Sequence, residues 1–235
     1  MNKLYVYACS YGKFGHVCQP PRALGEPFPA NPKPCPTCKQ YPEIANDKWV
    51  DDRSFPQLIA SALGLDLVNR SLPGASNYKL FTFFLEDLPY MDKTDTVLFQ
   101  WTHINRAWYA KDPRRSVMVH NSPDFESTAE FYYEHFYDDQ QSLSQLLGLV
   151  LYTKSKTPGK YCFGFADAYD TLNSINSMMC IDLHKIEGCI SPKQANVMMD
   201  VLNKEEMSKF HCGHPTEKGH RIAAEIYLKN IRALN

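Results

Sequence analysis

Several side chains that can do chemistry follow apolar runs, at points where predicted strands end. Ser10 follows the run from Lys3 to Cys9, and its hydroxyl can reach the edge of a sheet or belong to an ordinary loop. Gly74 comes after residues 65–69 and lets a backbone N–H approach a ligand, or forms a simple turn. His103 follows a third run. Hydroxyl, imidazole and backbone N–H groups together suit nucleophilic and proton-transfer chemistry.

The densest group of such side chains precedes and enters the last predicted helix, in residues 211–220, HCGHPTEKGH. His211 and His214 come before the helix, and His220 falls within it. On the helix, His220 is a packing or solvent-facing residue, with a substitute base as the alternative. Because an imidazole changes its protonation near neutral pH, the segment is a candidate for acid–base chemistry.

Cys35 and Cys38 have the spacing of a zinc knuckle, in which two thiolates bind one ion from a tight turn. A tetrahedral site needs two more ligands, and His16 and Cys18 are the nearest in the sequence. Zinc would hold the Pro- and Cys-rich insertion 16–49, which contains eight of the sixteen prolines and little apolar content. A disulfide or redox pair, or two unrelated free cysteines, are the alternatives.

The elements that must position these groups alternate between strand and helix. Apolar and β-branched runs predict strands at residues 3–9, 65–69, 95–101 and 161–165. Helices are predicted at 54–63, at 76–88, within 125–154 and from about 216. Strands joined by helical crossovers predict an α/β fold with a mostly parallel sheet and helices on both faces. The ligand site of such a sheet lies at the carboxyl ends of its strands.

Two of the predicted helices carry apolar residues at helical spacing, which indicates the face that each turns toward the sheet. In the helix within 125–154 these residues are Leu143, Leu146, Leu147, Val150 and Leu151. In the last helix they are Ile222, Ala223, Ile226 and Ile231.

The chain of 235 residues is 44% apolar and 22% charged, with a net charge of −1. This composition indicates one domain spanning residues 1–235, with the insertion 16–49 inside it. No run is long enough to span a bilayer and no secretion signal is recognised, so we expect no membrane partner, reduced thiols and a cytoplasmic location. The balanced charge provides no global field for nucleic acid.

A local patch of basic and aromatic side chains is the exception to this balance. Such a patch can stack on bases and contact phosphates, so a zinc-stabilised nucleic-acid module is one alternative function. The acidic stretch 124–139 that follows disfavours it. The patch consists of Trp101, Arg106, Trp108, Tyr109, Lys111, Arg114 and Arg115.

In their order along the chain, these groups resemble the sequence blocks of the SGNH (GDSL-like) hydrolase family. Residues 8–10, ACS, stand where that family has Gly-Asp-Ser after the first strand, and Asn69 leads to the glycine of the second block, Gly74. Residues 214–215, HP, followed by a helix, match the family's Asp-x-x-His-Pro block. The resemblance leaves out the insertion and much of 105–160.

The resemblance implies a flavodoxin-like, three-layer α/β/α sandwich and serine esterase chemistry, with Ser10 as nucleophile and His214 as general base. The backbone N–H groups of Ser10 and Gly74 would hold the oxyanion of the tetrahedral intermediate. The implied substrate is a small-molecule or carbohydrate ester, for example an O-acetylated sugar, with acyl transfer as the related reaction.

Two positions depart from the family pattern. Its third block offers an asparagine to the oxyanion, but residues 100–103 are QWTH, so His103 or Thr102 would donate instead. His211 stands where the family has the aspartate that orients the base. An imidazole can orient His214 but cannot compensate its positive charge, so a catalytically weak binding protein of the same fold is the second functional hypothesis.

The zinc hypothesis predicts about one zinc ion per native chain by elemental analysis. Because a structural site contributes folding free energy, Cys35→Ser should lose the metal and make the insertion sensitive to protease while the sandwich stays folded. A metal-free native protein would contradict the hypothesis.

Overall fold

The computed structural model describes residues 2–9, 54–72, 75–102, 104, 138–165, 186–190 and 217–234. These residues contain one sheet, the helices that cover it and a short 3-10 helix. In chain order the elements are β1 (Lys3–Tyr7), α2 (Phe55–Leu63), β2 (Asp66–Asn69), α3 (Asn77–Asp87), η2 (Leu88–Tyr90), β3 (Thr96–Trp101), α5 (Asp139–Lys156), β4 (Lys160–Phe165) and α8 (Glu217–Ala233).

The sheet is parallel throughout its described strands, in the order β2-β1-β3-β4. β1 pairs with β2 on one edge, with Tyr5 opposite Val68, and with β3 on the other, with Tyr5 opposite Val97. Residues 186–190 extend the sheet beyond β4 through a parallel bridge between Phe163 and Cys189. This order is that of a flavodoxin-like sheet.

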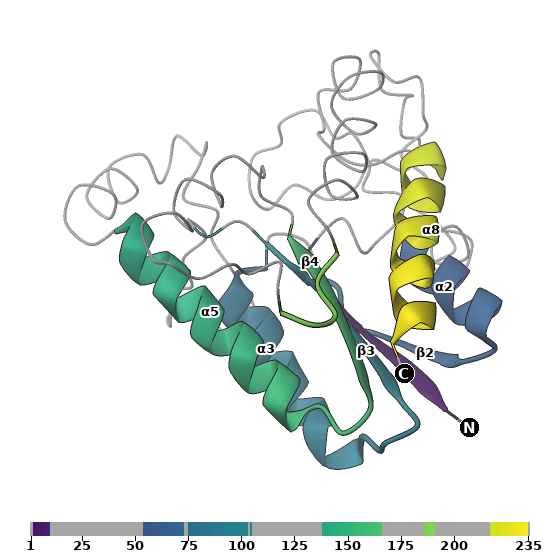
Figure 1. Cartoon of the computed structure of the whole chain (residues 1–235), viewed down its shortest axis with the longest axis horizontal. Helices are drawn as coiled ribbons and strands as arrows, with labels where there is room; N and C mark the ends of the chain where they lie inside the picture. The colour runs from purple at the N-terminus through teal and green to yellow at the C-terminus, as the bar shows by residue number, and fades with distance from the viewer. Residues whose placement is uncertain are drawn as a thin grey trace, which may run out of the picture.

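Two apolar clusters cover the two faces of the sheet and define three layers. Side chains alternate along β1, so Leu4 and Val6 lie in the cluster with α2 and α8, while Tyr5 and Tyr7 lie in the cluster with α3 and α5. Figure 1 shows α8 and α2 on one side of the sheet and α3 and α5 on the other. The predicted α/β/α sandwich is confirmed.

The ends of α2 follow the signals predicted from the sequence. The Ser54 hydroxyl accepts the N–H of Gln57 at 3.4 Å, and Pro56 lies in the first turn, where its missing N–H costs nothing. Gly64 ends the helix with a φ of +66°, which glycine adopts without strain.

The apolar face of α5 is narrower than its sequence predicts. Leu143, Leu146 and Val150 are buried in the cluster between the sheet and helices α3 and α5, but Leu151 is 48% exposed. Thr153 continues the buried face instead, and its hydroxyl donates to the carbonyl of Leu149 at 2.7 Å, so that burial does not leave the hydroxyl unpaired.

No helix among the described residues is long and apolar enough to cross a membrane.

The inward face of α8 contains a histidine that caps another helix. His220 is 1% exposed, and its Nδ1 accepts the N–H of Phe55, the first residue of α2, at 3.1 Å. The imidazole also stacks on the Phe55 ring, with centroids 6.0 Å apart. The Nδ1 lone pair is therefore engaged by the backbone, and this structure favours the packing role of His220 over a substitute base.

The cap predicts that His220→Phe weakens the fold, because the ring is kept while the acceptor for the Phe55 N–H is lost. We expect a loss of about 1–2 kcal/mol in the free energy of unfolding, measured in urea. Glu225→Ala, an exposed change on the same helix, is the control and should stay within about 0.5 kcal/mol of the parent. Equal stability of His220→Phe and Glu225→Ala would refute the capping role.

A second close contact joins α8 to β4 at Gly164. A Cβ there would lie 2.7 Å from the Tyr227 hydroxyl and 2.7 Å from Cδ1 of Ile190. Gly164→Ala should cost about 1–3 kcal/mol in unfolding free energy, because the core must move to accommodate the methyl group. Tyr227→Phe removes one of the two obstacles, so the double variant should lose less than the sum of the single changes. Strictly additive losses would show that the hydroxyl does not limit this site.

Candidate functional site

The carboxyl ends of β1 and β3 form the topological switch point of the sheet. From β1 the chain passes through α2 to β2 on one side, and from β3 it passes through α5 to β4 on the other. The two helices lie on opposite faces, so the connections diverge between the ends of β1 and β3. In doubly wound sheets ligands bind in the crevice at this point.

The end of β1 is enclosed on the side of β2 by continued backbone pairing. The N–H of Arg70 donates to the carbonyl of Val6 at 2.8 Å, and the N–H of Leu72 donates to the carbonyl of Ala8 at 3.0 Å. Ala8 and Cys9 are fully buried, and Ser10 is the next residue in the sequence. The segment after β2 therefore runs beside the residues that lead to Ser10.

On the other side, the start of α3 is bonded to the end of β3. The N–H of Thr102 donates to Oδ1 of Asn77 at 2.7 Å, and Nδ2 of Asn77 donates to the carbonyl of Thr102 at 3.0 Å. Ser76 caps the helix by accepting the N–H of Lys79 at 3.2 Å. These bonds join the start of α3 to the end of β3; in the sequence, Asn77 is three residues after Gly74 and Thr102 is one residue before His103.

Three buried side-chain oxygen atoms at these strand ends make no hydrogen bond to the described residues. Ser71 is 4% exposed and Thr102 is 1% exposed, yet their hydroxyls have no hydrogen-bond partner among the described residues. The same holds for Oε1 of the buried Gln100 on β3. Buried polar atoms are ordinarily satisfied, so this edge retains hydrogen-bonding capacity for water or a bound molecule.

The charge nearest this edge is neutralised within the fold. Arg70 forms a two-point ion pair with Asp87 on α3, and its Nε lies 2.9 Å from Oδ2. Tyr7 on β1 donates its hydroxyl to the same oxygen at 2.9 Å. Burial, and then the charge of Asp87, raise the pKa of Tyr7, while the hydrogen bond to Asp87 raises the pKa of Arg70. Tyr7 therefore stays protonated and acts as a structural donor.

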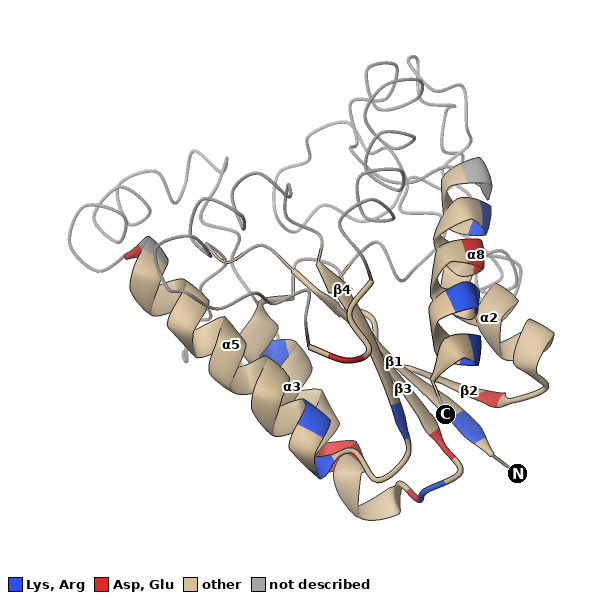
Figure 2. Cartoon of the chain, in the orientation of Figure 1, with Lys and Arg blue, Asp and Glu red and all other residues tan. Residues whose placement is uncertain are grey.

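Charged side chains on the strands gather at the opposite, amino edge. β1, β2 and β4 each begin with one, at Lys3, Asp66 and Lys160, and the rest of each strand is uncharged. Figure 2 shows these charges at the ends of the strands that face away from the carboxyl edge. The described part of the carboxyl edge offers hydroxyl and amide groups, which suit a neutral ligand.

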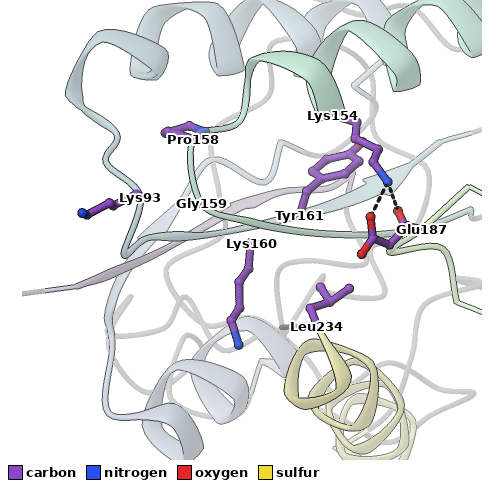
Figure 3. Close-up of a pocket in the computed structure, with 8 residues that line it drawn as sticks. All are labelled: Lys93, Lys154, Pro158, Gly159, Lys160, Tyr161, Glu187 and Leu234. Atoms are coloured by element: carbon purple, nitrogen blue, oxygen red, sulfur yellow. Dashed lines mark hydrogen bonds and ion pairs between the residues drawn. The ribbon is translucent and has the colours of Figure 1, made fainter.

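A cavity of about 350 Å³ lies at the amino edge, beside the start of β4. Its lining includes three lysines, but Lys154 donates to the Glu187 carboxylate at 3.0 Å, and Figure 3 shows Lys93 and Lys160 pointing in different directions. Since these ammonium groups do not converge, the cavity is a poor anion site, and it lies away from the switch point.

Thr102, the alternative oxyanion donor, is described and its buried hydroxyl is unpaired within the described part of the chain, but its role in catalysis stays a prediction. The other predicted site residues lie outside the described residues, and their roles remain predictions. They are Ser10, His16, Cys18, Cys35, Cys38, Gly74, His103, His211 and His214. Sequence reasoning did not select Asn77 or Ser71 at the same edge, because Asn77 resembles any polar residue at a helix start and Ser71 resembles any loop serine. Trp101, assigned to the basic and aromatic patch, is buried and stacks on Phe99 at 4.3 Å between centroids, so it cannot stack on a base.

Among the described residues, no group of three or more His, Cys, Asp or Glu side chains could hold a metal ion. The cysteines in this part of the chain, Cys9, Cys162 and Cys189, are free thiols. Burial raises the pKa of the Cys162 thiol, which therefore stays protonated and unreactive. The zinc hypothesis concerns other cysteines and stays a prediction.

No protein-family model matches the chain, and no curated protein matches it. Among solved structures, a G-D-S-L family protein from Desulfitobacterium hafniense DCB-2 is 12% identical with a TM-score of 0.48, and the match covers 98% of this chain and 99% of that one. An α/β hydrolase enzyme from the metagenome of Lake Arreo, Spain, is 15% identical with a TM-score of 0.46, over 100% of this chain and 96% of that one.

A third structure is a carbohydrate esterase family 2 enzyme with a carbohydrate-binding domain, from Corynascus thermopiles (Myceliophthora fergusii). It is 11% identical with a TM-score of 0.46, and the match covers 99% of this chain and 66% of that one. At these sequence identities and TM-scores, the comparisons assign neither a family nor an activity to this chain.

Proposed function

We propose that the chain is a serine ester hydrolase of the SGNH (GDSL-like) type, or an acyltransferase of the same chemistry. Ser10 is the nucleophile, His214 is the general base, and His211 orients it. The substrate is a neutral small-molecule or carbohydrate ester, such as an O-acetylated sugar.

The observation that supports this proposal most is the position of the end of β1. Ala8 and Cys9 are fully buried beyond the end of β1, which lies between β2 and β3, and Ser10 is the next residue in the sequence. A nucleophile needs a rigid support beside groups that can stabilise charge. Pairing on both edges gives the end of β1 that rigidity.

The proposed oxyanion hole consists of the backbone N–H groups of Ser10 and Gly74, with His103 as the side-chain donor. Two features of the described residues support it. Ala75 and Ser76 lead into the capped start of α3, where the positive end of the helix dipole favours negative charge. Arg70 is paired with Asp87, so its charge is already neutralised and does not compete for the developing oxyanion.

Acyl transfer on Ser10 takes place in two stages, acylation of the serine and then transfer of the acyl group to water or an alcohol. His214 takes the hydroxyl proton as Oγ attacks the ester carbonyl, and the tetrahedral oxyanion forms. The C–O bond to the alcohol then breaks, and His214 returns the proton to the leaving oxygen. Water, or an acceptor alcohol in the transferase, repeats the steps on the acyl-enzyme.

A fluorophosphonate probe tests the proposal, because it labels an activated serine without knowledge of the substrate. The native chain should be labelled at Ser10, and Ser10→Ala and His214→Ala should each reduce the labelling rate by roughly 10³-fold or more. Ser61→Ala, an exposed serine on α2, is the control and should be labelled like the parent.

Full labelling of Ser10→Ala would refute the assignment of the nucleophile. If the folded parent is inert to the probe while His211→Asp reacts, the protein is the catalytically weak binder of the same fold. In that case the restored carboxylate, which compensates the charge on His214, is what the natural chain lacks.

A further inference from the structure

A buried side-chain contact at the carboxyl edge joins the start of α3 to the residue that follows β3. The carboxamide of Asn77 makes both of its hydrogen bonds to the same residue, Thr102, at 2.7 Å to the N–H and 3.0 Å to the carbonyl. Asn77 is 9% exposed and Thr102 is 1% exposed. A planar amide that bonds both the N–H and the carbonyl of one buried residue fixes the backbone on either side of that residue in distance and orientation.

The two residues of this contact adjoin, in the sequence, the two segments that the proposed oxyanion hole requires. Asn77 follows Gly74 by three residues, and Thr102 immediately precedes His103. The N–H of Ala75 also donates to the carbonyl of Leu72 at 3.0 Å, which holds the start of this segment against the residues paired with β1. The described contacts thus link the ends of β1, β2 and β3 through the start of α3.

We propose that Asn77 is a positioning residue for ester hydrolysis, which sets the backbone at Thr102, and hence the donor that follows it, against the start of α3. This inference rests on the proposed function. Asn77 itself touches neither the substrate nor the reacting atoms. Its role is geometric, because donors must lie about 2.7–3.1 Å from the developing oxyanion and a misplacement of about 1 Å can cost 10²-fold in rate.

Asn77→Asp tests the inference with a side chain of the same shape. A protonated aspartic acid accepts the Thr102 N–H and donates to the Thr102 carbonyl, as the amide does. An ionised carboxylate keeps the first bond but faces the carbonyl oxygen with a negative charge. The defect should therefore appear as pH rises and disappear as pH falls.

The measurement is the rate of fluorophosphonate labelling at Ser10, and kcat and KM for an activated acyl ester, between pH 5 and 9. Dividing the rate of the variant by the rate of the parent at each pH cancels the titration of the general base, which both proteins share. We expect this ratio to fall by at least 10-fold between pH 5 and 9. Asn77→Leu, which can make neither bond, should lose roughly 10²-fold in kcat at every pH, with KM little changed.

Asp95→Asn is the matched control at the opposite edge. Asp95 is buried, and its carboxylate accepts the N–H of Lys3 at 2.8 Å and of Asp92 at 3.0 Å, so it ties the starts of β1 and β3. The change should lower Tm but leave kcat and the pH profile as in the parent. This separates positioning at the carboxyl edge from general loss of stability.

The outcomes distinguish this inference from the proposed function. If the parent is labelled at Ser10 and Asn77→Leu reacts at the parent rate, the positioning role is wrong and the hydrolase assignment stands. A kcat loss in Asp95→Asn that matches the loss in Asn77→Leu would also overturn it, because stability alone would then explain both. If the folded parent is not labelled, both proposals fail.

Discussion

Parallel pairing of β1 on both of its edges is the constraint from which the rest of the fold follows. Parallel neighbours cannot be joined by tight turns, so each connection must cross a face of the sheet as a helix. With both faces covered, the chain is buried from Leu4 in β1 to Cys9 beyond it, and this apolar sequence has no polar alternation. The same pairing brings the carboxyl ends of β1, β2 and β3 to one edge, where hydroxyl and amide groups gather.

The two edges of the sheet are held by different chemistry. At the amino edge Asp95 accepts the N–H of Lys3 with its side chain and the N–H of Lys160 with its carbonyl, which joins β1, β3 and β4. At the carboxyl edge a neutral amide, Asn77, makes the corresponding link to Thr102. The buried Asp95 carboxylate is compensated by the two backbone N–H groups that it accepts, whereas an uncompensated charge beside a reacting ester would disturb its electrostatics.

The sequence predicts the elements well and the contacts between them poorly. Apolar runs and the Ser54, Pro56 and Gly64 signals predict strands and helix ends because those depend on neighbouring residues. The exposure of Leu151 and the cap formed by His220 depend on partners far along the chain, and residue spacing contains no information about them. The sheet edge of the candidate site follows from topology, but the distances among Ser10, His214 and His211 require residues beyond the described part of the chain.

The position of α8 has a consequence for synthesis on the ribosome. α8 follows every other described element in the chain, yet it completes the cluster on one face and accepts the first N–H of α2. Until α8 has emerged, the nascent chain can assemble the α3 and α5 side of the sheet but leaves Val6, Ile59 and Leu98 uncovered. Such exposed apolar surface favours aggregation during translation, so the nascent polypeptide is a natural client for chaperones that bind near the exit tunnel.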